Sequence, residues 1–183
     1  MDNELINSCY KRFVAGEKEA FVKIVDEFRE GLIYFINRYV NNMDVAEDLS
    51  EDVFVELLIN PKRYNFTTSL KTYLFTIGRN KAVDYIRKNR HIVGVLDEGS
   101  AGVSDSFEEK YCKKEIEAAM HRIMKGLHSD YRTVLHLLYF EDMTYEEAGR
   151  VMKKSKKQIA NLSYRAKQTL KAALEKEGYE YEE

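Results

Sequence analysis

Apolar side chains recur along the chain at the three- to four-residue spacing of helices that bury one face. The longest such series runs from Phe21 to Tyr39 and predicts a helix over that span. The next predicted helix opens with Asp44 and Glu47, which are spaced as in a capping box. It is expected to end before Pro61, because the residue that precedes a proline avoids the helical conformation.

A third predicted helix begins near Thr68 and carries apolar residues on two opposite sides. One side holds Leu70, Leu74 and Ile77, and the other holds Phe75, Ala82 and Ile86. Since a helix that is apolar on both sides is buried, this one is expected to be the central helix of its domain.

About four more helices are predicted after residue 107. Two carry apolar stripes, made of Ile116, Met120, Ile123 and Leu127 in the first and of Tyr131, Val134, Leu135 and Leu138 in the second, which is started by Ser129. Capping boxes formed by Thr144 with Glu147 and by Ser155 with Gln158 start the last two. No alternating apolar and polar pattern predicts a strand, so the fold is expected to be all-α.

Residues 91–107 separate the two sets of helices. They contain three of the nine glycines together with three serines and show no helical spacing, which is typical of a flexible linker. We therefore expect small helical domains at 1–90 and 108–178, joined by a linker at 91–107 and followed by an acidic tail at 179–183. The linker would span on the order of 20–25 Å on average. Fully stretched it could reach roughly 55 Å, which would let the two domains touch DNA sites one to one and a half turns apart, at about 34–36 Å per turn.

Composition excludes several classes of protein. The 183 residues are 44% hydrophobic and 33% charged, which suits packed cores and not a disordered chain. Cys9 and Cys112 form no CxxC pair and the four histidines show no metal-ligand spacing, so no metal or other cofactor is expected. The acidic N-terminus is unlike a signal peptide, and the longest apolar runs are about five residues. We expect a cytoplasmic protein without membrane insertion.

The net charge of −2, taken alone, counts against a nucleic-acid-binding protein. The charges are segregated, however. Residues 41–60 hold six acids and no base, whereas 62–90 carry a net +7 and 150–171 carry a net +8. Two such basic blocks favour polyanion-binding surfaces over the alternative that they are ordinary solvated helix faces.

The basic block near the C-terminus has the pattern of a helix-turn-helix, with a short turn at Lys153–Ser155 before a longer basic helix. If Ile159 faces the core, the side chains on and beside the opposite stripe are of the types that contact base edges and phosphates. These candidates are Lys156, Lys157, Gln158, Asn161, Tyr164 and Arg165. Two packed helices with a solvated lysine face remain the alternative.

The first basic block interleaves aromatic and cationic residues, as sites for unpaired bases do. Most of its aromatic side chains, including Phe75, are expected in the core, and one or two at a nucleic acid. Lys62, Arg63 and Asn65 lie before the helix in a loop that could capture a base. The acidic helix at 44–58 instead suits a basic protein partner through Asp48, Glu51 and Asp52. An exposed helix face without function remains the alternative for these carboxylates.

The order of these motifs resembles a known family. Residues 45–58 (VAEDLSEDVFVELL) and 66–88 (FTTSLKTYLFTIGRNKAVDYIRK) are similar to region 2 of the sigma-70 family of RNA polymerase sigma factors. Residues 127–174 look like region 4 of that family. With only a linker between the two regions, the chain resembles the extracytoplasmic-function (ECF) group, which are initiation factors and not enzymes.

The resemblance implies a role for each surface. Core polymerase would be bound, at its beta-prime clamp helices, by Asp48, Leu49, Glu51, Asp52 and Phe54. The promoter −10 element would be recognised and opened by Lys62, Arg63, Asn65, Tyr73, Asn80, Lys81, Asp84, Arg87 and Lys88. The −35 element would be read by Lys156, Lys157, Gln158, Asn161, Tyr164 and Arg165. The implied partners are core RNA polymerase, including its beta flap, and double- and single-stranded promoter DNA. Because the surfaces of sigma factors are exposed, an anti-sigma factor is a further partner that the resemblance allows.

Some positions depart from the family pattern. Glu51 stands where glutamine is usual, Tyr73 where tryptophan is usual, and Gly149 falls in the first helix of the helix-turn-helix, where glycine costs helix stability. Two other hypotheses fit the sequence less well. A stand-alone helix-turn-helix regulator would not need residues 45–58 and 66–88, and an enzyme is disfavoured because no nucleophile or phosphate-loop motif is present.

Overall fold

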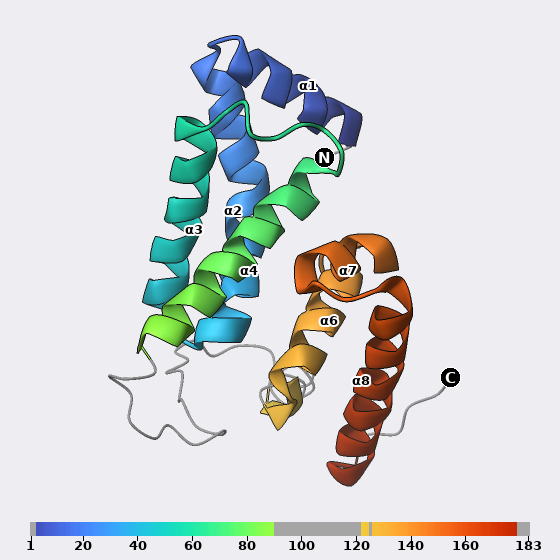
Figure 1. Cartoon of the computed structure of the whole chain (residues 1–183). Helices are drawn as coiled ribbons and strands as arrows, with labels where there is room; N and C mark the ends of the chain where they lie inside the picture. Colours follow the sequence, from blue (N-terminus) through green and yellow to red (C-terminus); the bar gives the residue numbers. More distant parts are fainter. Residues whose placement is uncertain (1–2, 90–121, 125, 179–183) are drawn as a thin grey trace.

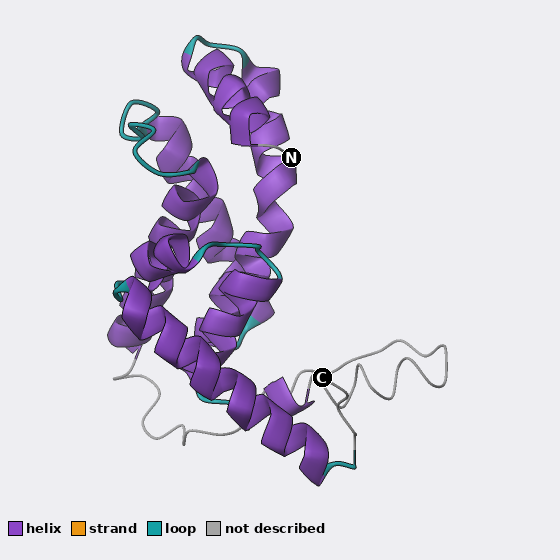
Figure 2. Cartoon of the chain, turned by 90° about the vertical axis from the view of Figure 1, so that its right-hand side faces the viewer, coloured by secondary structure: helices purple, strands orange, loops and turns teal. Residues whose placement is uncertain are grey.

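The computed structural model describes residues 3–89, 122–124 and 126–178. Within these ranges the chain forms helices and loops without a strand, which confirms the all-α prediction (Figures 1 and 2). The helices are α1 (Asn3–Val14), α2 (Lys18–Val40), α3 (Met43–Ile59), α4 (Leu70–Asn89), α6 (Ser129–Tyr139), α7 (Tyr145–Met152) and α8 (Lys156–Lys176). The predicted linker at 91–107, the segment from 108 to 121 with Ile116 and Met120, and the predicted tail at 179–183 lie outside the described residues.

Helix α4 is the central helix of the first half, as its two apolar sides predicted. It packs against α1, α2 and α3, and also against α7 from the second half. Leu70, Leu74, Phe75 and Ala82 are buried along it. Gly78 is buried too, and a methyl group there would lie 2.9 Å from a side-chain carbon of Leu32, so the glycine allows α2 to approach α4 closely.

The helix starts are partly those predicted. Both capping boxes, of Thr144 with Glu147 and of Ser155 with Gln158, are present. The predicted box of Asp44 with Glu47 is wrong, because α3 begins earlier and the Asn42 side chain accepts the backbone N–H of Val45 at 3.1 Å. An asparagine at this position satisfies a free N–H as well as the predicted box would.

Helix α6 does begin at Ser129, but the capping side chain is that of His128. Its Nδ1 accepts the backbone N–H of Asp130 at 3.3 Å. Helix α1 was not predicted as an element. It buries Ile6, Cys9 and Tyr10, which share one helical face, and it lies across one end of α2 and α4 (Figure 1).

The two sets of helices are in direct contact. Helix α4 packs on α7 and α2 packs on α6, so the helices before residue 90 and after residue 121 share one continuous hydrophobic core (Figure 1). The Phe35 ring of α2 stacks on the His136 ring of α6 with centroids 6.1 Å apart. The sequence predicted two domains on a flexible tether, and direct packing between them was not foreseen. In the described part of the chain, no helix has the length and apolar character needed to span a membrane.

Candidate nucleic-acid and polymerase interfaces

An open pocket of about 360 Å³ lies where the loop after α3 meets the middle of α4. It is lined by Glu56, Arg63, Tyr73, Thr76, Ile77, Asn80, Lys81 and Asp84. Five of these, namely Arg63, Tyr73, Asn80, Lys81 and Asp84, are among the residues that the sequence assigned to the −10 element. The structure therefore brings together side chains that are up to 21 positions apart, with an aromatic ring and cations at one concave surface.

The electrostatics of this pocket depend on Glu56, which the sequence did not single out as a DNA-site residue. Its Oε1 accepts a hydrogen bond from Arg63 Nη1 at 2.9 Å, and its Oε2 lies 3.4 Å from Lys81 Nζ. One carboxylate from α3 thus holds two cations from the loop and from α4. Burial raises the pKa of the Tyr73 phenol, an effect that Arg63 opposes and Glu56 assists, so the ring carries no charge at neutral pH.

The loop between α3 and α4 presents Lys62, Arg63 and Asn65, all exposed. Asn65 is fixed locally, because its Oδ1 accepts the backbone N–H of Thr67 at 3.2 Å and the Thr67 hydroxyl at 2.7 Å. This Asx-type turn uses the amide oxygen of Asn65, and the two amide N–H donors take no part in it. Two of the predicted loop residues are thus cationic, and the third is held in a defined conformation.

Further along α4, Arg87 and Lys88 are exposed in its last turn. Arg87 Nη2 lies 3.2 Å from Asp84 Oδ1, one turn earlier, and both side chains are largely open to solvent. Such an exposed pair is weak and can exchange for a phosphate at little cost. All nine residues assigned to the −10 element are therefore on the loop and on one length of α4.

The candidate recognition helix is α8. Lys156, Lys157, Gln158, Asn161, Tyr164 and Arg165 are all exposed on its first three turns, whereas Ile159, Ser163 and Ala166 are buried on the opposite side. The Tyr164 side chain is 64% exposed, so its ring is available for an external contact. The predicted division of this helix into an inner and an outer face is therefore present.

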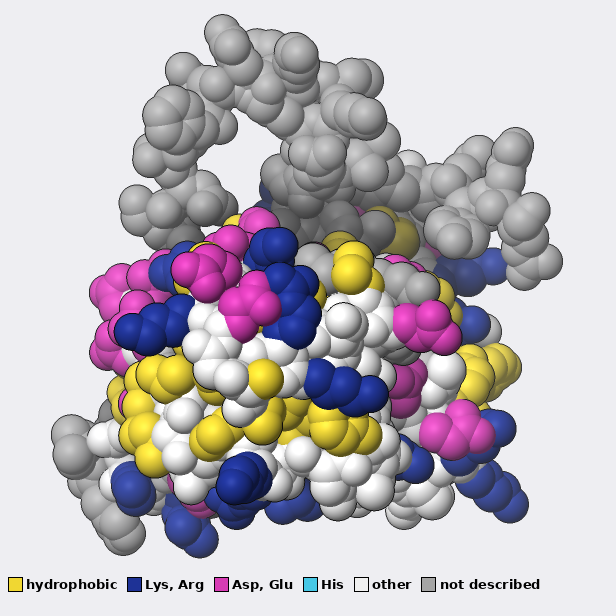
Figure 3. All heavy atoms as spheres, turned by 90° about the horizontal axis from the view of Figure 1, so that it is seen from above, with side chains coloured by type: hydrophobic (Ala, Val, Ile, Leu, Met, Phe, Trp, Pro, Cys, Tyr) yellow, Lys and Arg dark blue, Asp and Glu magenta, His cyan; other side chains and the backbone are white. Residues whose placement is uncertain are grey.

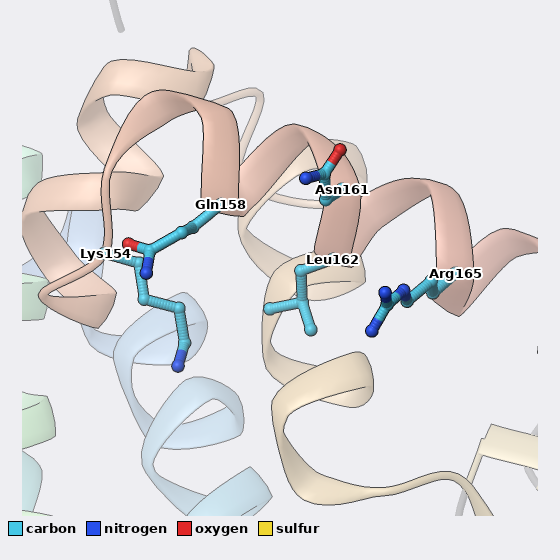
Figure 4. Close-up of a pocket in the computed structure, with 5 residues that line it drawn as sticks. All are labelled: Lys154, Gln158, Asn161, Leu162 and Arg165. Atoms are coloured by element: carbon cyan, nitrogen blue, oxygen red, sulfur yellow. The ribbon is translucent and has the colours of Figure 1, made fainter.

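Not all outer residues of α8 point the same way. Lys154, Gln158, Asn161, Leu162 and Arg165 line a hollow of about 270 Å³ beside α8 (Figure 4). Leu162 and Arg165 project on the side of α8 that faces α6, and Asn161 projects away from it (Figure 4). Lys156 pairs with Glu146 on α7 at 2.6 Å, and Lys154 with Asp130 on α6 at 3.2 Å, so these two cations have partners within the chain.

The turn between α7 and α8 is tight. Lys153 ends α7 in the left-handed conformation at φ 56°, and the Lys154 N–H returns to the Gly149 carbonyl at 2.9 Å. A methyl group on Gly149 would lie 2.6 Å from the Lys154 carbonyl oxygen. The glycine noted as a departure from the family pattern therefore has a steric reason here.

The acidic helix α3 presents Asp48, Glu51 and Asp52 to solvent, and Leu49 is half-buried. Phe54, assigned from the sequence to the polymerase contact, is only 6% exposed and packs in the core. The exposed apolar residues of α3 are instead Val55, Leu58 and Ile59, none of which was predicted to contact a partner. The exposed carboxylates are therefore followed by an apolar end on the same helix.

Polar side chains join the two sets of helices between α4 and α7. The carboxylate of Glu147 accepts hydrogen bonds from the hydroxyls of Ser69 at 3.0 Å and Thr72 at 3.4 Å, in addition to capping its own helix. Arg150 Nη1 donates to the Thr67 carbonyl at 3.4 Å. Helix α7 therefore sits against the end of the loop that carries Asn65.

Two comparisons with known families agree with this arrangement. Residues 24–92 match the family model described as Sigma-70 region 2, and residues 117–170 match the one described as Sigma-70, region 4. The class of protein that the fold defines is thus a two-region helical transcription factor. The chain belongs to the sigma-70 family of RNA polymerase sigma factors, in its ECF group. It is an initiation factor that directs RNA polymerase to promoters.

Curated relatives and solved structures extend the similarity over most of the chain. "ECF RNA polymerase sigma factor SigM" of Bacillus subtilis is 28% identical over 153 residues, covering 81% of this chain and 93% of that protein. The RNA polymerase sigma-H factor of Pseudomonas aeruginosa is 26% identical, covering 90% of this chain and 91% of that protein.

Two solved structures share the fold. The sigma factor RpoE of Bartonella quintana, in complex with the anti-sigma factor NepR, has a TM-score of 0.69 at 23% identity and covers 85% of this chain and 96% of its own. CnrH, in complex with the cytosolic domain of CnrY, has a TM-score of 0.65 at 20% identity and covers 95% of this chain and 97% of its own.

Proposed function

We propose that the pocket between the 60–69 loop and α4 is where this sigma factor captures the promoter −10 element as single strand. The observation that carries the proposal is the lining of that pocket, in which Arg63 and Lys81 flank the half-buried Tyr73 ring. Cations would hold the phosphates while the ring stacks on an extruded base, a contact worth about 1–3 kcal/mol. Asn65, beside the pocket, would hydrogen-bond a base edge.

We further propose that α8 reads the −35 element in the major groove. Arg165, Asn161, Gln158 and Lys157 are of the types that donate to base edges, and Lys156 would contact the phosphate backbone. Support comes from the exposure of all five side chains and from Asn161, which projects away from α6 (Figure 4). Leu162 and Arg165 border the hollow next to α6, so Arg165 would reorient to reach a base.

The third proposed surface is α3, which would dock on the clamp helices of the polymerase beta-prime subunit. Asp48, Glu51 and Asp52 supply the charge complementary to a basic partner, and Val55 with Leu58 supply apolar area beside it. Phe54 would act indirectly by packing α3 on the core. The beta flap would contact the second half of the chain.

The test of the −10 proposal needs the promoter first. Run-off transcription over genomic fragments with core polymerase and this protein, followed by sequencing of transcript ends, gives the −10 sequence. Holoenzyme affinity for a non-template-strand oligonucleotide with that sequence is then measured. Asn65→Ala is expected to lower the affinity by about five- to 150-fold, the range for a lost base contact of about 1–3 kcal/mol.

The control is Glu30→Ala, at an exposed position of α2 away from the pocket. Equal affinity of the Asn65→Ala and Glu30→Ala holoenzymes would contradict the −10 assignment. Tight, sequence-specific DNA binding by the free protein without polymerase would favour the stand-alone regulator instead.

We also propose that the protein acts in the cytoplasm, without catalysis of its own, and that an anti-sigma factor holds it inactive. The support for the last point is that RpoE and CnrH, which share its fold, were solved with NepR and with CnrY. Co-purification of a stoichiometric small protein that is released when transcription from the mapped promoters begins would test it.

A further inference from the structure

Two buried tyrosine hydroxyls hold the two ends of the 60–69 loop. Tyr10 of α1, which has no exposed surface, donates to the Pro61 carbonyl at 2.7 Å. Tyr64, which is 4% exposed, donates to the Thr68 carbonyl at 2.7 Å. These backbone oxygens flank the loop positions that face the −10 pocket, so the conformation between them is constrained at both ends.

The aromatic rings of the same residues support the middle of the loop. The Tyr10 ring packs edge-on against the rings of Tyr64 and Phe66, with centroids 4.9 Å and 5.8 Å apart. The centroid of the Tyr64 ring lies 4.7 Å from that of Phe66 and 5.3 Å from that of Tyr73. Lys11 of α1 places its ammonium 5.6 Å from the centroid of Phe66. A single aromatic cluster therefore runs from α1 beneath the loop to the ring that lines the pocket.

Phe66 itself is in the left-handed conformation, at φ 60°. That conformation costs a bulky residue about 1–3 kcal/mol and persists only where the surroundings fix it. The contacts from α1 and Tyr64 supply that constraint. This strained residue follows Asn65, whose side-chain Oδ1 accepts hydrogen bonds from the backbone N–H and the hydroxyl of Thr67. The two features together favour one conformation of the loop.

We infer that Tyr10 is a positioning residue for −10 recognition: its hydroxyl fixes the loop so that Arg63 and Asn65 meet the DNA without a further loss of conformational freedom. The inference rests on the proposed −10 site. Tyr10 lies before residue 24, where the match to region 2 begins, so the family comparison assigns it no part in that region. Burial raises the pKa of Tyr10 to about 12, with smaller contributions from Tyr73 and Tyr64, so the hydroxyl remains a donor throughout the physiological range.

A loop that is ordered before binding costs less to immobilise on DNA, since each fixed residue otherwise loses about 1–2 kcal/mol of backbone entropy. The Tyr10 bond acts on the loop and not on the base, so its loss would weaken binding through Asn65 and Arg63. Base preference would fall together with affinity, because a mobile loop presents Asn65 in several orientations.

The experiment compares Tyr10→Phe with Tyr34→Phe, both in holoenzyme. The first keeps the buried ring and removes one hydroxyl, and the second removes the hydroxyl of a tyrosine of α2 that is 46% exposed. We expect Tyr10→Phe to weaken binding to the mapped −10 non-template oligonucleotide about three- to tenfold, the scale of one lost hydrogen bond. Tyr34→Phe should leave the affinity for this oligonucleotide unchanged. Neither substitution should change the affinity of the protein for core polymerase.

A double-mutant cycle with Asn65→Ala separates positioning from general destabilisation. If Tyr10 acts through Asn65 and Arg63, Tyr10→Phe should cost less affinity in the Asn65→Ala background than in the unaltered protein, because only the Arg63 part of the effect remains. Tyr64→Phe, which frees the other end of the loop, should reproduce the effect of Tyr10→Phe.

The outcomes separate the two proposals. If Asn65→Ala leaves the oligonucleotide affinity unchanged, the −10 site itself is wrong. If Asn65→Ala weakens binding but Tyr10→Phe does not, the positioning role is overturned while the site stands. If Tyr10→Phe lowers the affinities for the oligonucleotide and for polymerase equally, Tyr10 contributes only to the stability of the core, and the inference is also overturned.

Discussion

The ammonium of Lys71 on α4 lies 2.8 Å from the carboxylate of Glu141, which follows α6, and donates to the Glu141 backbone carbonyl at 2.7 Å. The other carboxylate oxygen is 3.3 Å from Nε2 of the buried His136. Only 10% of the Glu141 side chain is exposed. One largely buried acid thus connects the region that matches region 2 with the region that matches region 4.

Replacing Lys71 by methionine should shift the chain toward a form in which the two regions separate. The variant keeps the side-chain length but leaves Glu141 with one charged partner fewer, which costs about 1–3 kcal/mol for a buried group. Small-angle X-ray scattering of the free protein should show a larger radius of gyration. Glu146→Gln, which breaks an exposed pair between α7 and α8, serves as the control and should leave the radius unchanged.

Gly31→Ala should disturb the same contact without altering any charge. A methyl group at this position of α2 would lie 2.6 Å from the Glu141 carboxylate oxygen and would displace that side chain. Alanine also favours the helix by about 1 kcal/mol. We expect the midpoint of thermal unfolding to stay the same or rise, while the radius of gyration measured by small-angle X-ray scattering increases. An unchanged radius would show that Glu141 relocates without loss of the contact.

Acid should weaken the contact between the regions. Burial alone would raise the pKa of Glu141, but hydrogen bonds and charges from His136 and Lys71 outweigh it and lower that pKa. Lys71 lowers the pKa of Glu141 only while the two regions are in contact. The contribution of Glu141 to the stability of that contact is therefore complete above the usual carboxyl pKa of about 4.3 and is lost as the pH falls through the lowered value. Hydrogen bonds likewise outweigh burial and lower the pKa of Glu147, which faces Ser69 and Thr72.

The acid effect is measured as the radius of gyration between pH 7 and pH 3 by small-angle X-ray scattering. Far-ultraviolet circular dichroism is recorded at the same pH values to detect loss of helix. Expansion should come before helix loss in the unaltered protein. In Glu141→Gln the radius should vary less with pH, since that side chain cannot titrate. An identical pH profile for both proteins would rule out Glu141 as the titrating group.

Gly149→Ala should destabilise the helix-turn-helix, although alanine is the better helix former. The new methyl group would meet the Lys154 carbonyl at 2.6 Å, and a backbone atom cannot move aside as a side chain can. We expect a loss of about 1–3 kcal/mol in the free energy of unfolding, measured by urea denaturation. The matched control is Gly126→Ala, since a methyl group there meets nothing within 4 Å.

The two proposed functions of α3 and α8 should be separable by substitution. Lys157→Ala with Arg165→Ala should lower transcription from promoters that depend on a −35 element, while polymerase still co-purifies. Asp48→Lys with Asp52→Lys should have the reverse effect and abolish co-purification, because reversal of two exposed charges repels a basic partner. Loss of co-purification in the first variant, or its persistence in the second, would contradict the assignment.

Much of the secondary structure could be predicted from local sequence. Thr144 with Glu147 and Ser155 with Gln158 start helices because each pair satisfies free backbone N–H groups within four residues, and no distant contact is needed. The predicted start at Asp44 was wrong because Asn42 provides the same hydrogen bond two residues earlier. Helix α1 was missed, although Ile6, Cys9, Tyr10 and Phe13 have helical spacing that could have indicated it.

The tertiary features could not be predicted in the same way. Nothing in the spacing of Lys71, His136 and Glu141 indicates that they meet, because the contact depends on how α2 packs on α6 and α4 packs on α7. Phe54 illustrates the converse: the motif assigned it to a partner, yet the packing of α3 buries it. Glu56 was counted only as one more acid of α3, and its role in the pocket emerges once the loop and α4 converge on it.

The side chain of Glu56 belongs to both proposed surfaces of the first region. It stands on α3, among the residues proposed to meet polymerase, and its two oxygens hold Arg63 and Lys81 at the proposed DNA pocket. A substitution of Glu56 would therefore alter the proposed polymerase surface and the proposed DNA pocket together. In descendants of this gene, promoter preference and fit to the polymerase would therefore be unable to drift independently at this position.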